Sequence, residues 1–183
     1  IKERVFEKQK PSQLDGFLLK NIDPNRALFV LKNISVSFLN KNRLFYALKN
    51  VSFQMKHGEC LGVVGGSGSG KTTLGRVFCG LEKSYDGEFC FPNTTDFLKN
   101  SVQMVYQDPF SSFNPKYTVG DSVCEIIDLY KTSFIPENLF ATVGLCSSLL
   151  SRFPHELSGG QKQRVSIARV LASNPSVIVF DES

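Results

Sequence analysis

One stretch decides the fold of this chain, and it reads Gly65, Gly66, Ser67, Gly68, Ser69, Gly70, Lys71, Thr72 and Thr73. It fits the pattern GxxxxGK followed by Ser or Thr, in which a glycine-rich loop joins a strand to a helix. Before it, the apolar residues 60–64 predict a buried strand. After it, apolar residues recur at helical spacing as far as Leu81, and Gly80 suits the helix end. The sequence therefore predicts a strand, loop and helix of the kind that begins an α/β core.

Such a loop suits the phosphate groups of a nucleotide. Backbone N–H groups at a helix start can approach phosphate oxygens closely where glycines carry no Cβ. Lys71 would then reach the outer phosphates, and the hydroxyl of Thr72 would bind Mg²⁺. The alternative is a flexible glycine-serine turn without a ligand. The flanking strand and helix make it the weaker interpretation.

The composition is that of an ordinary globular domain. Of 183 residues, 42% are apolar and 21% are charged, enough for one domain with a sizeable core. No apolar run approaches the roughly 18 residues of a membrane helix, and we expect neither a membrane span nor a signal peptide. The net charge of +4 is mild and dispersed, so no nucleic-acid partner is expected. Five scattered cysteines without a CxxC pair indicate reduced thiols and a cytoplasmic protein.

The rest of the chain predicts a domain over residues 28–183, preceded by a lead-in or linker at residues 1–27. Residues 27–38 and 45–55 predict paired antiparallel strands. A segment of about residues 108–156 opens with a Pro- and Ser-rich loop and predicts a small helical subdomain. Helices are predicted near 119–130, 136–150 and 157–174, and further strands at 87–91, 102–106 and 176–180.

Two carboxylates, Asp181 and Glu182, follow the last apolar strand. In a parallel α/β sheet, ligands bind at the carboxyl ends of strands, so these acids should face the phosphate loop. Asp181 would hold Mg²⁺, and Glu182 is the candidate general base for the water that attacks the γ-phosphate. The alternative, a strand that simply enters a solvated turn, is weakened by the presence of Lys71.

A second helix start is made by Ser158, Gly159, Gly160 and Gln161. Ser158 with Gln161 three residues later is a capping box, which many helices carry without binding anything. The two glycines add exposed N–H groups at the positive end of a helix dipole, which suits an anion. Since one nucleotide seldom needs both helix starts of one chain, the pattern predicts a dimer that shares its nucleotides.

Taken in order, these motifs resemble the nucleotide-binding domain of ATP-binding cassette (ABC) transporters. The resemblance covers roughly residues 30–183. It rests on the loop at 65–73, Gln107 after a strand, LSGGQ at 157–161 and the acidic strand end at 181–182. More narrowly, residues 106–115 and 152–156 resemble the branch of oligopeptide, dipeptide and nickel importers. The resemblance implies a P-loop NTPase core with a RecA-like parallel sheet, an antiparallel β subdomain and a small helical subdomain.

The resemblance also implies roles for the matching residues. Residues 65–73 would form the Walker A loop, and Gln107 would contact Mg²⁺ and sense the transmembrane partner. Residues 157–161 would be the signature motif, offered across the dimer. Asp181 and Glu182 would be the Walker B aspartate and the catalytic glutamate. Phe38 matches the aromatic that stacks on adenine, with a core or strand aromatic as the alternative.

Three departures from the family pattern affect these expectations. The chain starts at Ile1 and stops at Ser183, before the family's D-loop and switch histidine, so we expect a longer protein that supplies the missing C-terminal part. This stretch is expected to bind ATP, with turnover only in the longer form. The segment between Gln107 and Leu157 is short, so a helix that meets the membrane partner is expected to be lost. Gly66 replaces a more frequent acidic or proline residue, which backbone binding should tolerate.

The expected function is that of the ATP-hydrolysing subunit of an importer for peptides or a similar small solute. Its expected partners are ATP, a second ABC domain in a head-to-tail homodimer or heterodimer, and separate transmembrane permease subunits. This places it on the inner face of the cell membrane. Two alternatives remain: a soluble ABC protein that acts on ribosomes or DNA, and a non-catalytic ATP-binding fragment.

Overall fold

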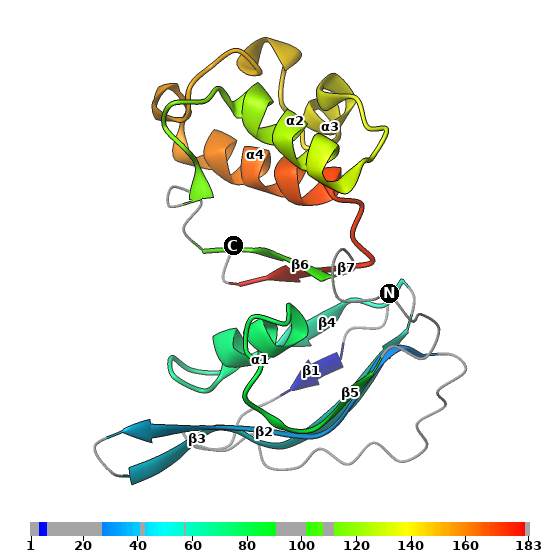
Figure 1. Cartoon of the computed structure of the whole chain (residues 1–183), viewed down its shortest axis with the longest axis vertical. Coiled ribbons are helices and arrows are strands. Elements are labelled where there is room, and N and C mark those ends of the chain that lie inside the picture. The colour runs from blue at the N-terminus through cyan, green and yellow to red at the C-terminus, as the bar shows by residue number, and fades with distance from the viewer. Residues whose placement is uncertain are drawn as a thin grey trace. The chain divides into compact units, whose positions relative to one another are not determined.

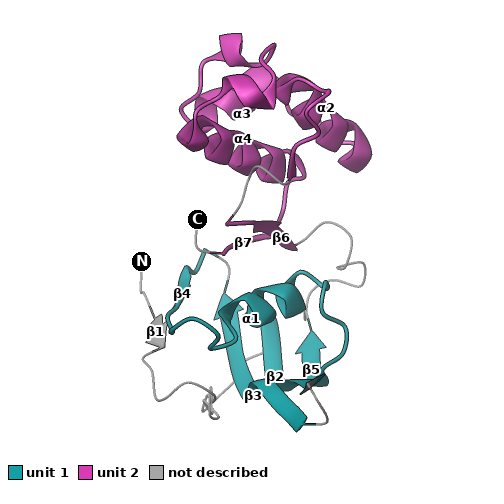
Figure 2. Ribbon diagram, turned by 90° about the vertical axis from the view of Figure 1, so that its left-hand side faces the viewer, with its two compact units in different colours: residues 1–97 teal, residues 98–183 magenta. Residues whose placement is uncertain are grey.

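The computed structural model (Figure 1) describes residues 4–6, 27–40, 43–56, 58–90, 102–107 and 112–181. The chain divides into two compact units, residues 1–97 and 98–183 (Figure 2). Each unit has its own buried core. Among the described residues, no helix has the length and apolar character needed to cross a bilayer.

An antiparallel sheet in the order β3-β2-β5 forms the base of the first unit. β2 (Ala27–Asn40) and β3 (Arg43–Lys56) pair along most of their length, and β5 (Asp86–Cys90) pairs with the other edge of β2. The predicted antiparallel pair is confirmed, and both of its strands are longer than the sequence indicated. Residue 91, which the prediction included in the third strand, lies outside the described residues.

Two buried serines accept hydrogen bonds from backbone N–H groups at irregular positions of the long β2–β3 pair. Asn33 and Asn50 have φ angles of 53° and 50°, and the register shifts beside Asn33. The N–H of Asn33 donates to Oγ of Ser52 at 2.7 Å, and the N–H of Asn50 donates to Oγ of Ser35 at 2.9 Å. A backbone N–H that leaves the ladder needs another acceptor, so these side chains stabilise the bend.

Four phenylalanines fill the centre of the first unit. Phe78, at the end of α1 (Lys71–Phe78), packs against three aromatic rings of the sheet, each in an edge-to-face arrangement. Its centroid lies 4.9 Å from Phe29, 5.5 Å from Phe53 and 5.6 Å from Phe89. Each such pair adds about 0.5–1.5 kcal/mol to the burial of its apolar area. This packing fixes α1 on the sheet and so fixes where the glycine-rich loop must end.

The loop begins at β4 (Leu61–Val63), which pairs in parallel with β1 (Arg4–Phe6). The predicted order of strand, glycine-rich loop and helix is therefore present. β1 lies within residues 1–27, where the sequence predicted a lead-in without a regular element.

The second unit combines a parallel strand pair with a helical part. β6 (Val102–Val105) and β7 (Val177–Phe180) pair in register, so that Val105 faces Phe180. The helices α2 (Val119–Tyr130), α3 (Pro136–Thr142) and α4 (Gly159–Ala172) pack together (Figure 1). They share one core, formed by Phe113, Val119, Val123, Leu139, Phe140, Leu145, Leu157, Val165, Ala168 and Ala172.

The predicted helix at 136–150 is wrong in its second half. α3 ends at Thr142, and Gly144 has a φ angle of 70°, a left-handed conformation that ends helices. The chain then turns Leu145 into the core and forms only two 3₁₀ turns, Ser147–Leu149 and Pro154–Glu156, before α4. Apolar spacing alone did not reveal this break, because residues on both sides of it face the same core.

The close contact between α2 and residue 150 gives a stability prediction. The N–H of Gly120 donates to the carbonyl oxygen of Leu150 at 2.9 Å, and a Cβ on Gly120 would lie 2.7 Å from that oxygen. Gly120→Ala should therefore lower the free energy of unfolding by about 1–3 kcal/mol. Gly159→Ala is the control, since no atom lies within 4 Å of a Cβ there. Chemical denaturation of both variants measures this, and equal midpoints would contradict it.

Candidate functional site

Lys71 ties the end of the glycine-rich loop to its beginning. Its ammonium group donates to the carbonyl oxygens of Gly65 at 2.9 Å and Gly66 at 3.1 Å. Within the loop, the N–H of Ser69 donates to the carbonyl of Gly66 at 3.2 Å. The loop therefore closes around its own lysine, with the positive charge held beside the backbone at the start of α1.

Gly70 makes the turn from loop to helix possible. It caps α1 in the left-handed conformation, with φ 94°, and a Cβ there would lie 2.3 Å from the carbonyl oxygen of Ala47 on β3. Only glycine fits this position. The N–H of Leu74 donates to the carbonyl oxygen of Gly70 at 2.8 Å, so α1 begins directly at the end of the glycine-rich loop. The N-terminal end of a helix is a type of site that binds phosphate.

An aromatic pair lies near the tip of the β2–β3 pair. Phe38, predicted to stack on adenine, is 44% exposed, which excludes a core role. Phe45 lies directly opposite it in the antiparallel register and is 46% exposed. Opposed residues of antiparallel strands share one face, so Phe45 belongs to the same surface as Phe38. The sequence analysis missed Phe45, which only the strand register reveals.

Residues 157–161, predicted to be the signature motif, lead into α4, which has the predicted capping box. Ser158 Oγ accepts from the N–H of Gln161 at 3.3 Å, and the N–H of Ser158 donates to Oε1 of Gln161 at 2.9 Å. Gly159 and Gly160 are exposed, and no atom lies within 4 Å of a Cβ built on either. Packing within this chain therefore does not require glycine at these two positions, unlike Gly70.

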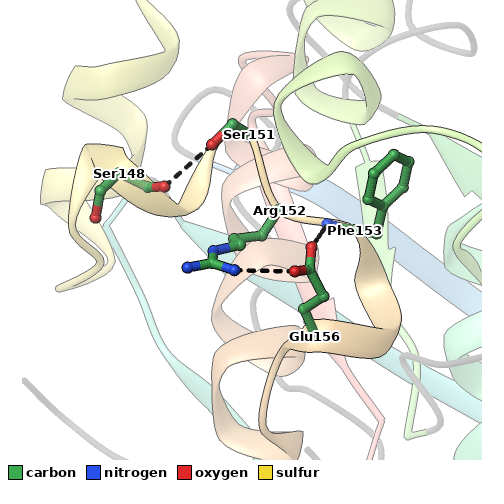
Figure 3. Close-up of polar contacts among 5 residues, drawn as sticks. All are labelled: Ser148, Ser151, Arg152, Phe153 and Glu156. Atoms are coloured by element: carbon green, nitrogen blue, oxygen red, sulfur yellow. Dashed lines mark hydrogen bonds and ion pairs between the residues drawn. The ribbon is translucent and has the colours of Figure 1, made fainter.

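A charged turn fixes the chain just before the signature motif (Figure 3). Glu156 accepts from the N–H of Phe153 at 2.7 Å and from Nη1 of Arg152 at 2.9 Å. The Phe153 N–H, and then the Arg152 guanidinium, hold the pKa of Glu156 below its usual value of 4.5. Pro154 and Leu157 on either side of Glu156 are buried, so the turn anchors Ser158 to the helical core.

Gln107 and Asp181 lie at the same edge of the parallel strand pair. Gln107 follows β6 by two positions, and Asp181 directly follows β7, whose last residue pairs with Val105. The N–H of Asp181 donates to the carbonyl of Val105 at 3.1 Å. The structure thus brings the carboxyl ends of these two predicted strands together. Glu182 lies outside the described residues.

Each unit carries part of the predicted site. The glycine-rich loop, Lys71, Thr72 and Phe38 belong to the first unit, and Gln107, the signature motif and Asp181 belong to the second. Among the described residues, no group of three or more His, Cys, Asp and Glu side chains forms a metal cluster. The predicted Mg²⁺ ligands Thr72, Gln107 and Asp181 supply hydroxyl, amide and carboxylate oxygens, the donor types that Mg²⁺ prefers.

Comparison with known proteins identifies the family. Residues 48–183 match the family described as ABC transporter. The chain belongs to the ABC transporter family. It is 37% identical to the oligopeptide transport ATP-binding protein OppF of Bacillus subtilis over 172 residues, 85% of this chain and 56% of that protein. It is 40% identical to the glutathione import ATP-binding protein GsiA of Escherichia coli over 150 residues, 73% of this chain and 24% of that protein.

The ABC family also contains the solved structures that this chain resembles. The dimeric ATP-binding cassette MJ0796, in a post-hydrolysis state with ADP and Pi, matches with a TM-score of 0.70 at 29% identity, over 84% of this chain and 73% of that one. The cassette cbiO1 of Clostridium perfringens matches with a TM-score of 0.69 at 27% identity, over 85% of this chain and 65% of that one. The predicted fold class is confirmed. The chain spans about half the length of the OppF relative.

The lowered pKa of Glu156 predicts that the stabilisation contributed by this turn depends on pH. A carboxylate with a lower pKa in the folded state stabilises the fold above its unfolded pKa, and this stabilisation is lost as pH falls through the folded value. Glu156→Gln should therefore lower the free energy of unfolding near neutral pH, with the difference from wild type vanishing well below pH 4.5. Denaturation at several pH values measures this. Glu137→Gln, an exposed acid in the first turn of α3, is the control, and an equal pH response in both variants would refute the assignment.

Proposed function

We propose that this chain is the ATP-binding and ATP-hydrolysing part of an ABC importer for peptides or a similar small solute, acting through a separate permease. The observation that carries the proposal is the loop closed by Lys71 on Gly65 and Gly66, at a helix start that only Gly70 permits. The names of the relatives, which are oligopeptide and glutathione transport ATP-binding proteins, support the solute class.

The residues of the site would have different roles in binding and hydrolysing ATP. The amides at residues 65–73 would bind the phosphates, and Lys71 would neutralise charge on the outer ones. Thr72, Gln107 and Asp181 would hold Mg²⁺, which would offset the negative charge of the phosphates. Glu182 would accept the proton of the water that attacks the γ-phosphate.

A second copy would complete the site in a head-to-tail dimer. Ser158, Gly159 and Gly160 would face the nucleotide bound by the partner's phosphate loop. Two observations support this: the open space at both glycines, and the dimeric state of the similar cassette bound to ADP and Pi. The dimer can be a homodimer or a heterodimer. The protein would lie in the cytoplasm, on the inner face of the cell membrane, through its permease.

The role of Glu182 is tested by Glu182→Gln in the complete protein. Loss of the general base should lower kcat by about 100-fold or more while ATP affinity stays near that of wild type. Steady-state hydrolysis and equilibrium ATP binding measure the two effects. Glu137→Gln, far from the motifs in sequence, is the control and should leave both unchanged. Full turnover by the Glu182 variant would remove the catalytic assignment, and binding without turnover by wild type would favour the non-catalytic alternative.

The adenine contact is tested by Phe38→Ala. Because stacking on an aromatic contributes about 1–3 kcal/mol per base, ATP affinity should fall roughly tenfold. Leu39→Ala is the control, since Leu39 is 73% exposed and lies on the other face of the strand. Calorimetric titration with ATP measures the affinity of both variants. The same measurement on Phe45→Ala shows whether Phe45 also contributes to the adenine contact. Equal affinities for the Phe38 and Leu39 variants would exclude the stacking role.

A further inference from the structure

The β2–β3 pair contains two β-bulges near its middle, one in each strand. The first lies at Asn33 in β2 and the second at Asn50 in β3, and both residues have the left-handed backbone that asparagine tolerates better than most residues. We call residues 36–40 and 43–48, which lie beyond both bulges, the outer part of the pair. Since there is one bulge in each strand, the second restores the register that the first shifts, so two aligned pairs on either side of them share one register, Leu31 with Phe53 and Val36 with Leu48.

Each bulge forms two reciprocal hydrogen bonds with a serine of the opposite strand. Oγ of Ser52 accepts from the N–H of Asn33 at 2.7 Å and donates to Oδ1 of the same residue at 3.2 Å. Ser35 forms the same two bonds with Asn50, at 2.9 Å and 3.3 Å. Both serines are buried, whereas both asparagines are exposed. Each bulge N–H, which has left the strand ladder, therefore depends on one hydroxyl group of the facing strand.

The neighbouring strand β5 also fits the first bulge. Gly87 has a φ angle of 106°, and a Cβ there would lie 2.6 Å from the carbonyl oxygens of both Lys32 and Asn33. β5 pairs with β2 on both sides of this point. Glycine on one neighbouring strand and serine on the other are thus both suited to the bulge, so the sheet is built around it.

The two bulges separate parts of the strand pair that contact opposite ends of α1. On one side of the bulges, rings of β2 and β3 pack against Phe78 at the end of the helix. On the other side, the carbonyl oxygen of Ala47 lies 2.3 Å from a Cβ built on Gly70, directly before the helix. Phe38 and Phe45 lie on the same outer part as Ala47. Because a bulge bends its strand, the two bulges determine how this outer part approaches the phosphate loop.

We propose that Ser35 and Ser52 are positioning residues for the adenine contact, because the bulges that they stabilise set where Phe38 and Phe45 lie relative to the phosphate loop. A nucleotide joins its base to its phosphates over a limited span, so stacking needs an aromatic ring at a matching place. The serines are buried and act through the backbone of the outer part. The inference rests on the proposed function, since it requires that Phe38 stacks on adenine.

The test compares ATP with inorganic tripolyphosphate, which has the phosphates without the base. In the complete protein, Ser52→Ala leaves the N–H of Asn33 without its acceptor, and the dissociation constant for ATP should rise about fivefold as part of the stacking is lost. The constant for tripolyphosphate should change by less than about twofold, since the phosphate loop lies away from the bulge. Titration calorimetry in the presence of Mg²⁺ measures both constants. Ser122→Ala, which removes a buried hydroxyl from α2, is the control and should change neither.

A second variant tests the proposal even if the serine variant does not fold. Asn33→Gly combined with Asn50→Gly keeps both serine acceptors, and glycine adopts the φ angles of 53° and 50° without strain. It removes the two side-chain oxygens to which the serines donate and frees the backbone at both bulges. The dissociation constant for ATP should rise about threefold, and that for tripolyphosphate should again stay within about twofold.

The Phe38→Ala background separates positioning from general damage to the fold. In that background Ser52→Ala should have no further effect on ATP affinity, because the contact that it positions is already gone. Equal losses of ATP and tripolyphosphate affinity, an equal effect with and without Phe38, or unchanged ATP affinity in every bulge variant would overturn the proposal. If wild type instead bound neither ATP nor tripolyphosphate, the proposed function itself would fail.

Discussion

The left-handed backbone at Gly70 is the constraint on which the phosphate site depends. A Cβ at this position would lie 2.3 Å from the carbonyl of Ala47, so β3 and the start of α1 can approach this closely only without a side chain. Phe78 packs the other end of α1 on three rings of the sheet. The helix is therefore fixed at both ends, and its first N–H groups are set in place by the fold rather than by a ligand.

The sequence predicted the parts whose signals are local. Helix 119–130 and the capping box of Ser158 and Gln161 match the structure, because caps and apolar spacing act over a few residues. The break after Thr142 was missed because Gly144 is a single residue inside a sustained apolar pattern. Phe45 was missed for a different reason. Its partner, Phe38, is defined by the strand register, which leaves no mark in the local sequence.

Glycine residues are present in this chain for two different reasons, and the structure distinguishes between them. At Gly70 the fold itself demands the missing side chain, through both the φ angle and the neighbouring carbonyl. At Gly159 and Gly160 the backbone is ordinary helix and the space beyond it is open. Glycine costs about 1 kcal/mol relative to alanine inside a helix, so two in succession weaken the first turn of α4 without any return from packing. The bare backbone at this place supports the proposed approach of a second copy with its bound nucleotide.

The two capping boxes of the helical part indicate what that approaching group is. At α2 the box is formed by Thr118 and Asp121, so a carboxylate occupies the positive end of the helix dipole. At α4 the same box uses Gln161, a neutral amide, and the first turn holds no acid. The hydroxyl of Ser158 accepts the N–H of Gln161 through a lone pair, which leaves its O–H able to donate outward. The helix start at α2 is therefore neutralised from within, whereas the start at α4 keeps its partial positive charge, which supports the proposed contact with a phosphate of a second copy's nucleotide.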